Sequence, residues 1–286
     1  MNNFEAALAN ATSGDNPSLL AAIGLVFDSK GNVLYHHAAG RQSLNPDAPP
    51  VHPCSVVSLG SAGKFITHVA ALQCVERGLI GIDDAIDAHL PELAEMDVIE
   101  SAGESYSLRR PTKSITLRHL LTHSSGVSYH GHPLVQKWNQ SSNGAAPINV
   151  QLGTMPLLYD PGEGWSYGSS IAWTALLVSR LTGRKLSHFV KETIFDALGM
   201  SLSSFQPEAS PTVFEKMLQM VQRQDGKLVP APPEAAQGLA CSVTDIQLIL
   251  ADLMSADPKL LSKASTDLFF EPAFAPGSAA PFRATS

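Results

Sequence analysis

Ser61 and Lys64 form an S-x-x-K pattern at the start of a segment with helical periodicity. Residues three apart on a helix share one face, so the Lys64 amine can reach the Ser61 hydroxyl. A serine hydroxyl is a weak nucleophile until a base removes its proton, and a lysine amine can be that base. The N–H groups of a first helical turn also favour negative charge that develops nearby. The pair therefore indicates a serine nucleophile with a lysine as its base. An N-capping serine followed by a surface lysine is the alternative.

Ser166 is a second candidate nucleophile, because Gly164–Gly168 matches the G-x-S-x-G elbow. That elbow needs a buried strand before it, and an acid followed by a histidine after it. The turn-forming segment Asp160–Glu163 intervenes instead of a strand. His188 is the one histidine after Ser166, and no Asp or Glu lies between them. The order of residues therefore argues against this elbow, and Ser166 is predicted to lie in a loop.

Four histidines, His119, His123, His130 and His132, lie close together in the sequence. No Glu follows His119, so the H-E-x-x-H zinc pattern is absent. The three cysteines have no C-x-x-C spacing. The histidines are interpreted as helix-end or core residues, and the sequence predicts neither a metal ion nor a cofactor.

The helix that would carry Lys64 is predicted over Ala62–Arg77 and ends at Gly78. Before it, Leu19–Phe27 and Val33–Ala39 flank a turn and predict an antiparallel hairpin. Further helices are predicted at 116–121, 170–181, 186–198 and 244–254, and a second hairpin at 217–229. Strands at both ends and helices in the middle indicate a sheet subdomain formed by residues 1–83 and 200–286. Residues 84–199 would then form a mainly helical subdomain.

Several ordered motifs resemble the serine β-lactamase/penicillin-binding-protein-like family. The matching segments are Ser61–Lys64 for the nucleophile motif, Thr116–Gly126 for the Leu-Arg-His-Leu-Leu-Thr-His segment, Asp160–Tyr167 for the second catalytic loop, and Gly238–Asp245 for a late helix entry. By this resemblance Ser61 forms the acyl-enzyme, Lys64 is the general base, and Tyr167 shuttles or stabilises the proton. Within the family, Ala71–Leu79 and Leu90–Leu93 resemble the fungal polyketide acyltransferases.

The resemblance implies an α/β (α+β) chain with the β-lactamase/transpeptidase-like fold, an antiparallel sheet and a helical subdomain. The chain stops at Ser286, before the late strands that the family implies, so we expect a sheet that is truncated at the C-terminus. The implied function is transfer of an acyl group from a thioester to a hydroxyl of a secondary metabolite. An esterase or β-lactamase-like hydrolase is one alternative. A catalytically impaired, truncated member that acts as a binding protein is another.

The composition indicates which classes of partner and which cellular location to expect. Of 286 residues, 44% are hydrophobic and 16% are charged, which indicates a packed globular core. The net charge of −7 and the lack of a Lys/Arg run argue against nucleic acid as a partner. The longest apolar run, Leu19–Phe27, is far shorter than a membrane span. The first basic residue is Lys30, so the positive start of a signal peptide is absent and a cytoplasmic location is expected.

Charge is distributed unevenly along the chain. Residues 82–104 hold eight acidic residues and no basic one, whereas residues 105–159 hold five basic residues and no acidic one. The five are Arg109, Arg110, Lys113, Arg118 and Lys137. Two interpretations remain open. The basic residues form a solvated face whose charges cluster by chance, or, as the resemblance to the fungal acyltransferases implies, they form a docking patch for an acidic acyl-carrier domain that delivers the thioester.

Overall fold

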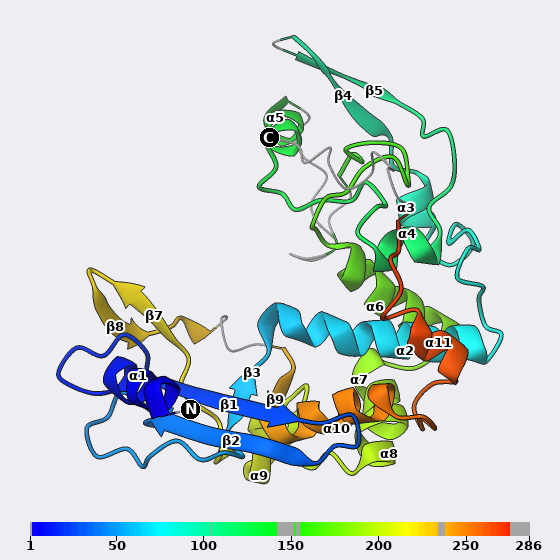
Figure 1. The fold of residues 1–286 in the computed structure, drawn as a ribbon. Coiled ribbons are helices and arrows are strands. Elements are labelled where there is room, and N and C mark those ends of the chain that lie inside the picture. Colours follow the sequence, from blue (N-terminus) through cyan, green and yellow to red (C-terminus); the bar gives the residue numbers. More distant parts are fainter. Residues whose placement is uncertain (1, 104, 142–151, 153–154, 234–237, 275–286) are drawn as a thin grey trace. The chain divides into compact units, whose positions relative to one another are not determined.

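The computed structural model describes residues 2–103, 105–141, 152, 155–233 and 238–274 (Figure 1). Internal contacts divide the chain into two units. Unit 1 combines Met1–Gly63 with Val190–Lys263, and unit 2 combines Lys64–Phe189 with Ala264–Ser286. The expected subdomains, 1–83 with 200–286 and 84–199, stay a prediction. The expected truncation of the sheet concerns residues outside the described ones.

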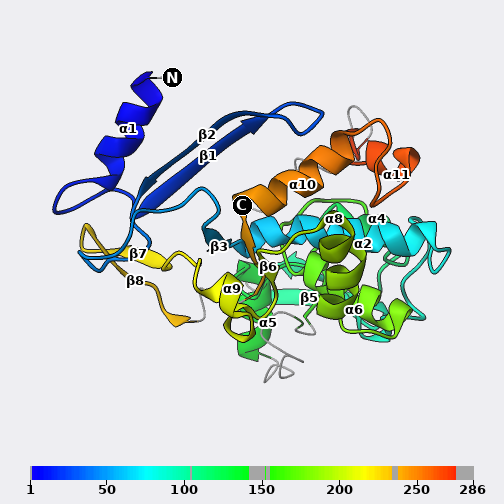
Figure 2. The ribbon, with the colours of Figure 1, turned by 90° about the horizontal axis from the view of Figure 1, so that it is seen from below.

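Unit 1 contains the predicted N-terminal hairpin. Strand β1 (Ala21–Phe27) pairs antiparallel with β2 (Val33–Gly40), and helix α1 (Asn2–Thr12) packs against both strands (Figures 1 and 2). The rings of Phe4 and Tyr35 meet edge to face, with centroids 6.2 Å apart. The hairpin is confirmed, whereas the sequence reasoning did not predict α1.

A three-stranded antiparallel sheet in unit 1 leads the chain to Ser61. Its order is β3 (Val56–Ser58), β9 (Ala240–Ser242) and β6 (Ser203–Ser204). The N–H of Leu59 continues the ladder by donating to the carbonyl of Leu239 at 2.9 Å. The end of β3 is therefore fixed just before the candidate nucleophile.

The other parts of unit 1 follow the predictions closely. Hairpin β7 (Val221–Gln224) and β8 (Lys227–Pro230) is confirmed. So is α10 (Val243–Met254), whose first turn is capped by the Ser242 hydroxyl. The segment predicted as one helix over 186–198 begins in unit 2 and continues in unit 1. It consists of α7 (Leu186–Val190), a π-helical turn (Lys191–Phe195) and α8 (Asp196–Leu198). A short helix α9 (Pro211–Phe214) follows β6.

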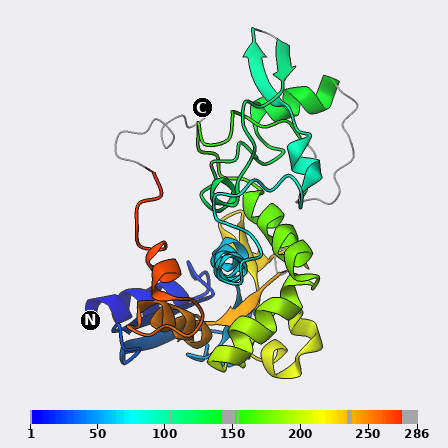
Figure 3. The ribbon, with the colours of Figure 1, turned by 90° about the vertical axis from the view of Figure 1, so that its right-hand side faces the viewer.

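Unit 2 is built on two long helices. Helix α2 (Lys64–Glu76), viewed nearly end-on in Figure 3, packs against α6 (Ser170–Thr182). Helix α4 (Leu117–Leu121) contacts α6 and begins with a capping box, in which the Thr116 hydroxyl accepts the His119 N–H. Fully buried side chains such as Trp173 form the core between these helices. The helices at 116–121 and 170–181 are confirmed.

The remaining elements of unit 2 were not predicted. Strands β4 (Val98–Ala102) and β5 (Ser105–Arg109) form a hairpin, and α5 (Pro133–Ser141) contacts β5. The short helices α3 (Pro91–Ala94) and α11 (Lys263–Asp267) complete the described elements. Across the described residues, no helix combines the length and apolar character needed to cross a membrane.

Candidate active site

Ser61 lies in a tight turn between β3 and α2. The predicted helix 62–77 is confirmed as α2, but residues Gly60–Gly63 form a 3₁₀ turn before it. Ser61 is exposed to solvent. A strand end and a helix start therefore flank the serine directly.

Lys64 is the first residue of α2 and is half-buried. Its Nζ lies 5.1 Å from the centroid of the Tyr167 ring, a cation–π distance within unit 2. Two of the three predicted site residues thus come together from segments that are about a hundred positions apart in the sequence. The catalytic roles of Ser61, Lys64 and Tyr167 stay predictions.

His123 lies beside Tyr167 within unit 2, although it was interpreted from the sequence as a structural histidine. Its ring centroid is 4.7 Å from that of Tyr167. Its pKa is lowered to about 4, mainly by burial and to a smaller extent by the neighbouring His68 and Lys64. The ring is therefore neutral at neutral pH. Its Nδ1 is buried and has no hydrogen-bond partner among the described residues.

The backbone of His123 has the left-handed conformation, with φ at 57°. This conformation is uncommon outside glycine, although His tolerates it better than most residues. It turns the carbonyl of His123 toward the loop that carries Tyr167. That carbonyl accepts the N–H of Ser166 at 3.0 Å and the hydroxyl of Tyr159 at 3.3 Å. One residue therefore holds the loop through both its ring and its backbone.

Asp160 fixes the beginning of the same loop. Its buried carboxylate accepts two hydrogen bonds from the guanidinium of Arg109, at 3.2 and 2.6 Å, and one from the N–H of Thr112 at 2.6 Å. The Arg109 hydrogen bond is the main reason that the pKa of Asp160 falls to about 2. The N–H of Gly162 donates to the carbonyl of Ser124 at 2.7 Å. The loop is thus tied to β5 and to the segment after α4.

Gly168 allows the chain to pass very close to its neighbour directly after Tyr167. A Cβ at this position would lie 2.6 Å from the carbonyl oxygen of Val127 and from the Cα of Ser128. These are backbone atoms, which cannot move as a flexible side chain can. The Ser169 hydroxyl donates to the carbonyl of Ser128 at 3.3 Å. Only glycine fits here without displacing the backbone on one side of the contact.

Ser166 and His119, which were also considered from the sequence, occupy positions that the fold explains. Ser166 is buried in a loop, as predicted, with no strand in the described residues just before it. His119 Nδ1 accepts the N–H of Thr116 in the capping box of α4. Within the described part of the chain, no cluster of three His, Cys, Asp or Glu side chains could hold a metal ion.

The basic residues between 105 and 118 are paired with carboxylates. Arg109 contacts Glu100 and Asp160, Arg110 contacts Asp97, Lys113 contacts Glu163, and Arg118 contacts Asp83. The nitrogen–oxygen distances range from 2.6 Å for Arg118 to 3.5 Å for Arg110. These pairs neutralise most of the positive charge of the segment. These ion pairs therefore favour the interpretation of the basic segment as a solvated face, rather than as a docking patch for a carrier domain.

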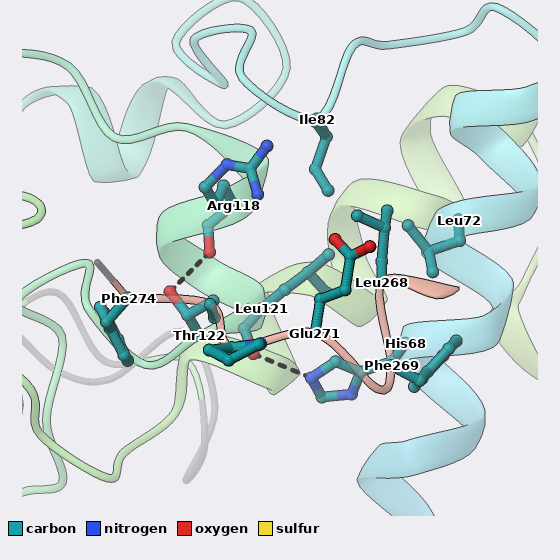
Figure 4. Close-up of a pocket in the computed structure, with 12 residues that line it drawn as sticks. His68, Leu72, Ile82, Arg118, Leu121, Thr122, Leu268, Phe269, Glu271 and Phe274 are labelled. Atoms are coloured by element: carbon teal, nitrogen blue, oxygen red, sulfur yellow. Dashed lines mark hydrogen bonds between the residues drawn. The ribbon is translucent and has the colours of Figure 1, made fainter. Parts of the chain in front are cut away.

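A cavity of about 390 Å³ lies within unit 2, beside the second and third turns of α2 (Figure 4). Its lining comes from α2 and the segment after it, from α4 and its C-cap, and from residues 268–274. The lining residues are His68, Leu72, Ile82, Arg118, Leu121, Thr122, Leu268, Phe269, Glu271, Pro272, Ala273 and Phe274. The ring of His68 faces two carbonyl oxygens, that of Lys64 at 2.8 Å and that of Leu121 at 2.9 Å. His68 thus links the first turn of α2 to the end of α4.

Comparison with known proteins identifies the family of this chain. Residues 22–285 match the family model described as Beta-lactamase. The chain belongs to the Beta-lactamase family. Among solved structures, it resembles unliganded Simvastatin Synthase (LovD) from Aspergillus terreus with a TM-score of 0.86 and 30% identity, covering 96% of this chain and 73% of that one. The octameric penicillin-binding protein homologue from Pyrococcus abyssi has a TM-score of 0.67 at 22% identity. This similarity supports the fold and nothing more.

Several curated relatives of this Beta-lactamase family chain are named for acyl transfer or ester cleavage. Acyltransferase calJ of Penicillium decumbens is 32% identical, over 95% of this chain and 74% of its own length. Lovastatin esterase of Penicillium rubens is 33% identical, over 94% of this chain and 73% of its own length. Monacolin J acid methylbutanoyltransferase of Aspergillus terreus is 32% identical, over 89% of this chain and 67% of its own length. The predicted family, fold class and enzyme class are confirmed.

Proposed function

We propose that this protein is a serine acyltransferase that moves an acyl group from a thioester to the hydroxyl of a secondary metabolite. The observation that carries the proposal is the contact between Lys64 and Tyr167 at the helix start that follows Ser61. The relatives named acyltransferase and methylbutanoyltransferase support the reaction type. We also propose a cytoplasmic location, which microscopy of a fluorescent fusion protein tests.

In the first half-reaction, the Ser61 hydroxyl oxygen attacks the carbonyl carbon of the thioester while the Lys64 amine accepts the hydroxyl proton. The carbon–sulfur bond then breaks, and the Tyr167 hydroxyl relays the proton to the leaving thiolate. The products are a free thiol and an ester on Ser61. In the second half-reaction, the acceptor alcohol attacks this ester through the same groups, and Ser61 recovers its proton.

Ester hydrolysis is the second candidate function, and the similarity to Lovastatin esterase favours it. The first half-reaction is the same, but water replaces the alcohol as the acceptor. Transfer requires a pocket that orients an alcohol and excludes water. A non-catalytic binding role is the third candidate, and it predicts that Ser61 never becomes acylated. A carrier-protein domain as the source of the thioester also stays a proposal.

The first experiment tests covalent chemistry at Ser61. The protein is treated with a fluorophosphonate or an activated acyl thioester, and the labelled peptide is identified by mass spectrometry. We expect one adduct, on Ser61, that Ser61→Ala abolishes and the control Ser166→Ala retains. A label on Ser166, or a label that survives Ser61→Ala, would show that the nucleophile is wrong.

The second experiment separates transfer from hydrolysis. The acyl-enzyme is isolated and divided between buffer and buffer with a candidate alcohol, and the free acid and the new ester are quantified. An acyltransferase gives mainly the ester and turns over slowly in buffer alone. Equal rates of acyl loss with and without alcohol would identify a hydrolase, and the absence of any acyl-enzyme would favour a binding protein.

A further inference from the structure

Thr112 connects the surface of unit 2 to the start of the loop that carries Tyr167. It is exposed to solvent, in the loop between β5 and α4. Its N–H donates to the buried carboxylate of Asp160 at 2.6 Å, and its side chain hydrogen-bonds the same carboxylate. A chemical change at this exposed hydroxyl therefore acts directly on the residue that fixes the beginning of the loop.

Three cations lie close to Thr112 in the sequence. Arg109 and Arg110 precede it and Lys113 follows it. The guanidinium of Arg109 is bound to Asp160, and one carboxylate oxygen of Asp160 accepts both Arg109 and the N–H of Thr112. The ion pairs of Arg110 and Lys113 are longer, at 3.5 and 3.4 Å, and both side chains are largely exposed. Exposed pairs of this kind contribute little to stability, so these cations are able to change partners.

The same segment lines a cavity of about 410 Å³ within unit 2. Its lining includes Thr112 between Arg110 and Lys113, and it also includes the carboxylates of Asp87 and Glu95. The charge of the cavity is therefore mixed, and a free anion gains little there. A phosphate that is covalently attached to Thr112 is different, because the attachment keeps it beside the two cations at a high effective concentration.

The residues before Thr112 carry a charge pattern that a protein kinase recognises. In Arg109-Arg110-Pro111-Thr112, two arginines stand at the third and second positions before the hydroxyl. Kinases select substrates by such patterns, and an acidic substrate groove selects arginines. Residues 110–114 lie outside helices and strands, so this loop is able to enter such a groove in an extended form.

We propose that Thr112 is the phosphorylation site of an arginine-directed protein kinase, and that its phosphate releases the loop that carries Tyr167. The hydroxyl oxygen of Thr112 attacks the γ-phosphorus of ATP, the bond from this phosphorus to the bridging oxygen breaks, and ADP leaves. The hydroxyl proton passes to the kinase. The phosphate then places about two negative charges next to the carboxylate of Asp160.

The phosphate competes with Asp160 for Arg109. Phosphorylation removes the hydroxyl donor of Thr112 and puts like charges side by side, which is unfavourable. A guanidinium forms two parallel hydrogen bonds with a phosphate as it does with a carboxylate, so Arg109 moves to the phosphate. Lys113, which contacts Glu163 of the same loop, is attracted in the same way. The loop loses its anchor, and under the proposed function, on which this step rests, acyl transfer slows.

The first experiment tests the site. The folded full chain is incubated with ATP and the catalytic subunit of cAMP-dependent protein kinase, which selects two arginines before the hydroxyl, and mass spectrometry maps the phosphate. We expect one phosphate, on Thr112, which Thr112→Ala abolishes and Thr112→Ser retains. Ser114→Ala is the matched control, because Ser114 is the neighbouring exposed hydroxyl. A phosphate on Ser114 would overturn the site.

A synthetic peptide of residues 107–116 is treated with the same kinase. It should be phosphorylated at a rate similar to that of the folded protein, because the loop is exposed. A labelled peptide together with an unlabelled protein would show that the folded chain hides Thr112, and would overturn the proposal. A peptide that the kinase does not label would overturn the assignment of an arginine-directed kinase.

Hydrogen exchange tests the release of the loop without using activity. The N–H groups of Gly162 and Ser166 donate to carbonyls after α4, so they report whether the loop is held. Phosphorylation should speed their exchange about tenfold, because the anchoring hydrogen bonds are lost, and should leave α10 in unit 1 unchanged. In Asp160→Asn, phosphorylation should add little. Unchanged exchange in the phosphorylated wild type, or an equal change in Asp160→Asn, would overturn the release of the loop.

Kinetics connect the release to the proposed function. Complete phosphorylation should lower kcat about tenfold or more with little change in KM, and a phosphatase should restore it. Thr112→Ala should have the same kcat with and without the kinase. An unchanged kcat in the phosphorylated wild type would overturn the regulatory role. If Ser61 forms no acyl-enzyme, the proposed function fails, but hydrogen exchange still decides whether the phosphate releases the loop.

Discussion

At the scale of single residues, the structure keeps His123 uncharged beside Lys64. A positive charge there would oppose the uptake of a proton by the Lys64 amine, which the proposed mechanism requires. The pKa of His123 falls from its usual 6.5 to about 4, mainly because the ring is buried. The His123 ring therefore binds a proton more readily in the unfolded chain than in the folded protein. Folding stability must decrease as the pH falls from 6.5 to 4, and be fully present above that window.

We predict that His123→Asn reduces this loss of stability in acid. Asn tolerates the left-handed backbone and does not titrate. Between pH 6.5 and 4, the loss of unfolding free energy should be smaller than in the wild type by about 1–2 kcal/mol, allowing for solvent screening at a half-buried site. Urea titrations at several pH values measure it. His188→Asn, at an exposed position of α7, is the control and should behave as the wild type.

The Asp160–Arg109 pair leads to a prediction about activity. Asp160→Asn keeps the shape of the side chain but removes the charge that holds two guanidinium hydrogen bonds. The loop that carries Tyr167 should loosen, and kcat should fall roughly tenfold to a hundredfold while the KM changes little. Glu100→Gln is the control, because Glu100 is the exposed partner of the same arginine. An equal loss in both variants would mean that the loop is positioned by other contacts.

At the scale of elements, Gly168 sets the distance between the start of α6 and the segment after α4. Gly168→Ala should cost about 1–3 kcal/mol of stability through overpacking, and should lower activity by shifting Tyr167. Thermal melting and initial rates measure the two effects. Gly131→Ala is the matched control, because a Cβ at Gly131 meets nothing within 4 Å. If Gly168→Ala melts and reacts like Gly131→Ala, the close approach does not constrain the loop.

The elements predicted correctly from the sequence have strong local signals. Helices α2 and α6 have long apolar patterns and stop at Gly78 and Gly183, and α10 begins at the capping Ser242. Helix α1 and the hairpin β4–β5 lack such signals, because their exposed surfaces hide the periodicity and tertiary contacts stabilise them.

The candidate site was predicted in part. The S-x-x-K spacing places Ser61 and Lys64 near each other by local geometry, whereas the contact of Lys64 with Tyr167 followed from resemblance to a family. His123 was missed, because neither its left-handed backbone nor its burial is visible in a sequence. The contacts between loops that are distant in sequence depend on the packed structure.

At the scale of the whole molecule, the net charge of −7 and the pairing of the basic segment argue against electrostatic attraction of an acidic carrier. We predict that salt changes kcat/KM for a carrier-bound acyl group by less than about twofold, as it does for a small free thioester. Arg110→Glu should likewise affect both donors equally, since Arg110 is an exposed member of the segment. A selective loss with the carrier-bound donor would restore the docking patch.

The pairing of β3 with β9 has a consequence for the order of assembly during translation. Val56, just before the serine turn, pairs with Ser242, which the ribosome makes much later. Most of the helices that surround Lys64 lie between these two positions and can form first, because their contacts are more local. We therefore expect the strand before Ser61 to be fixed only after Ser242 has been made. The nascent chain would then remain unreactive toward thioesters until that point.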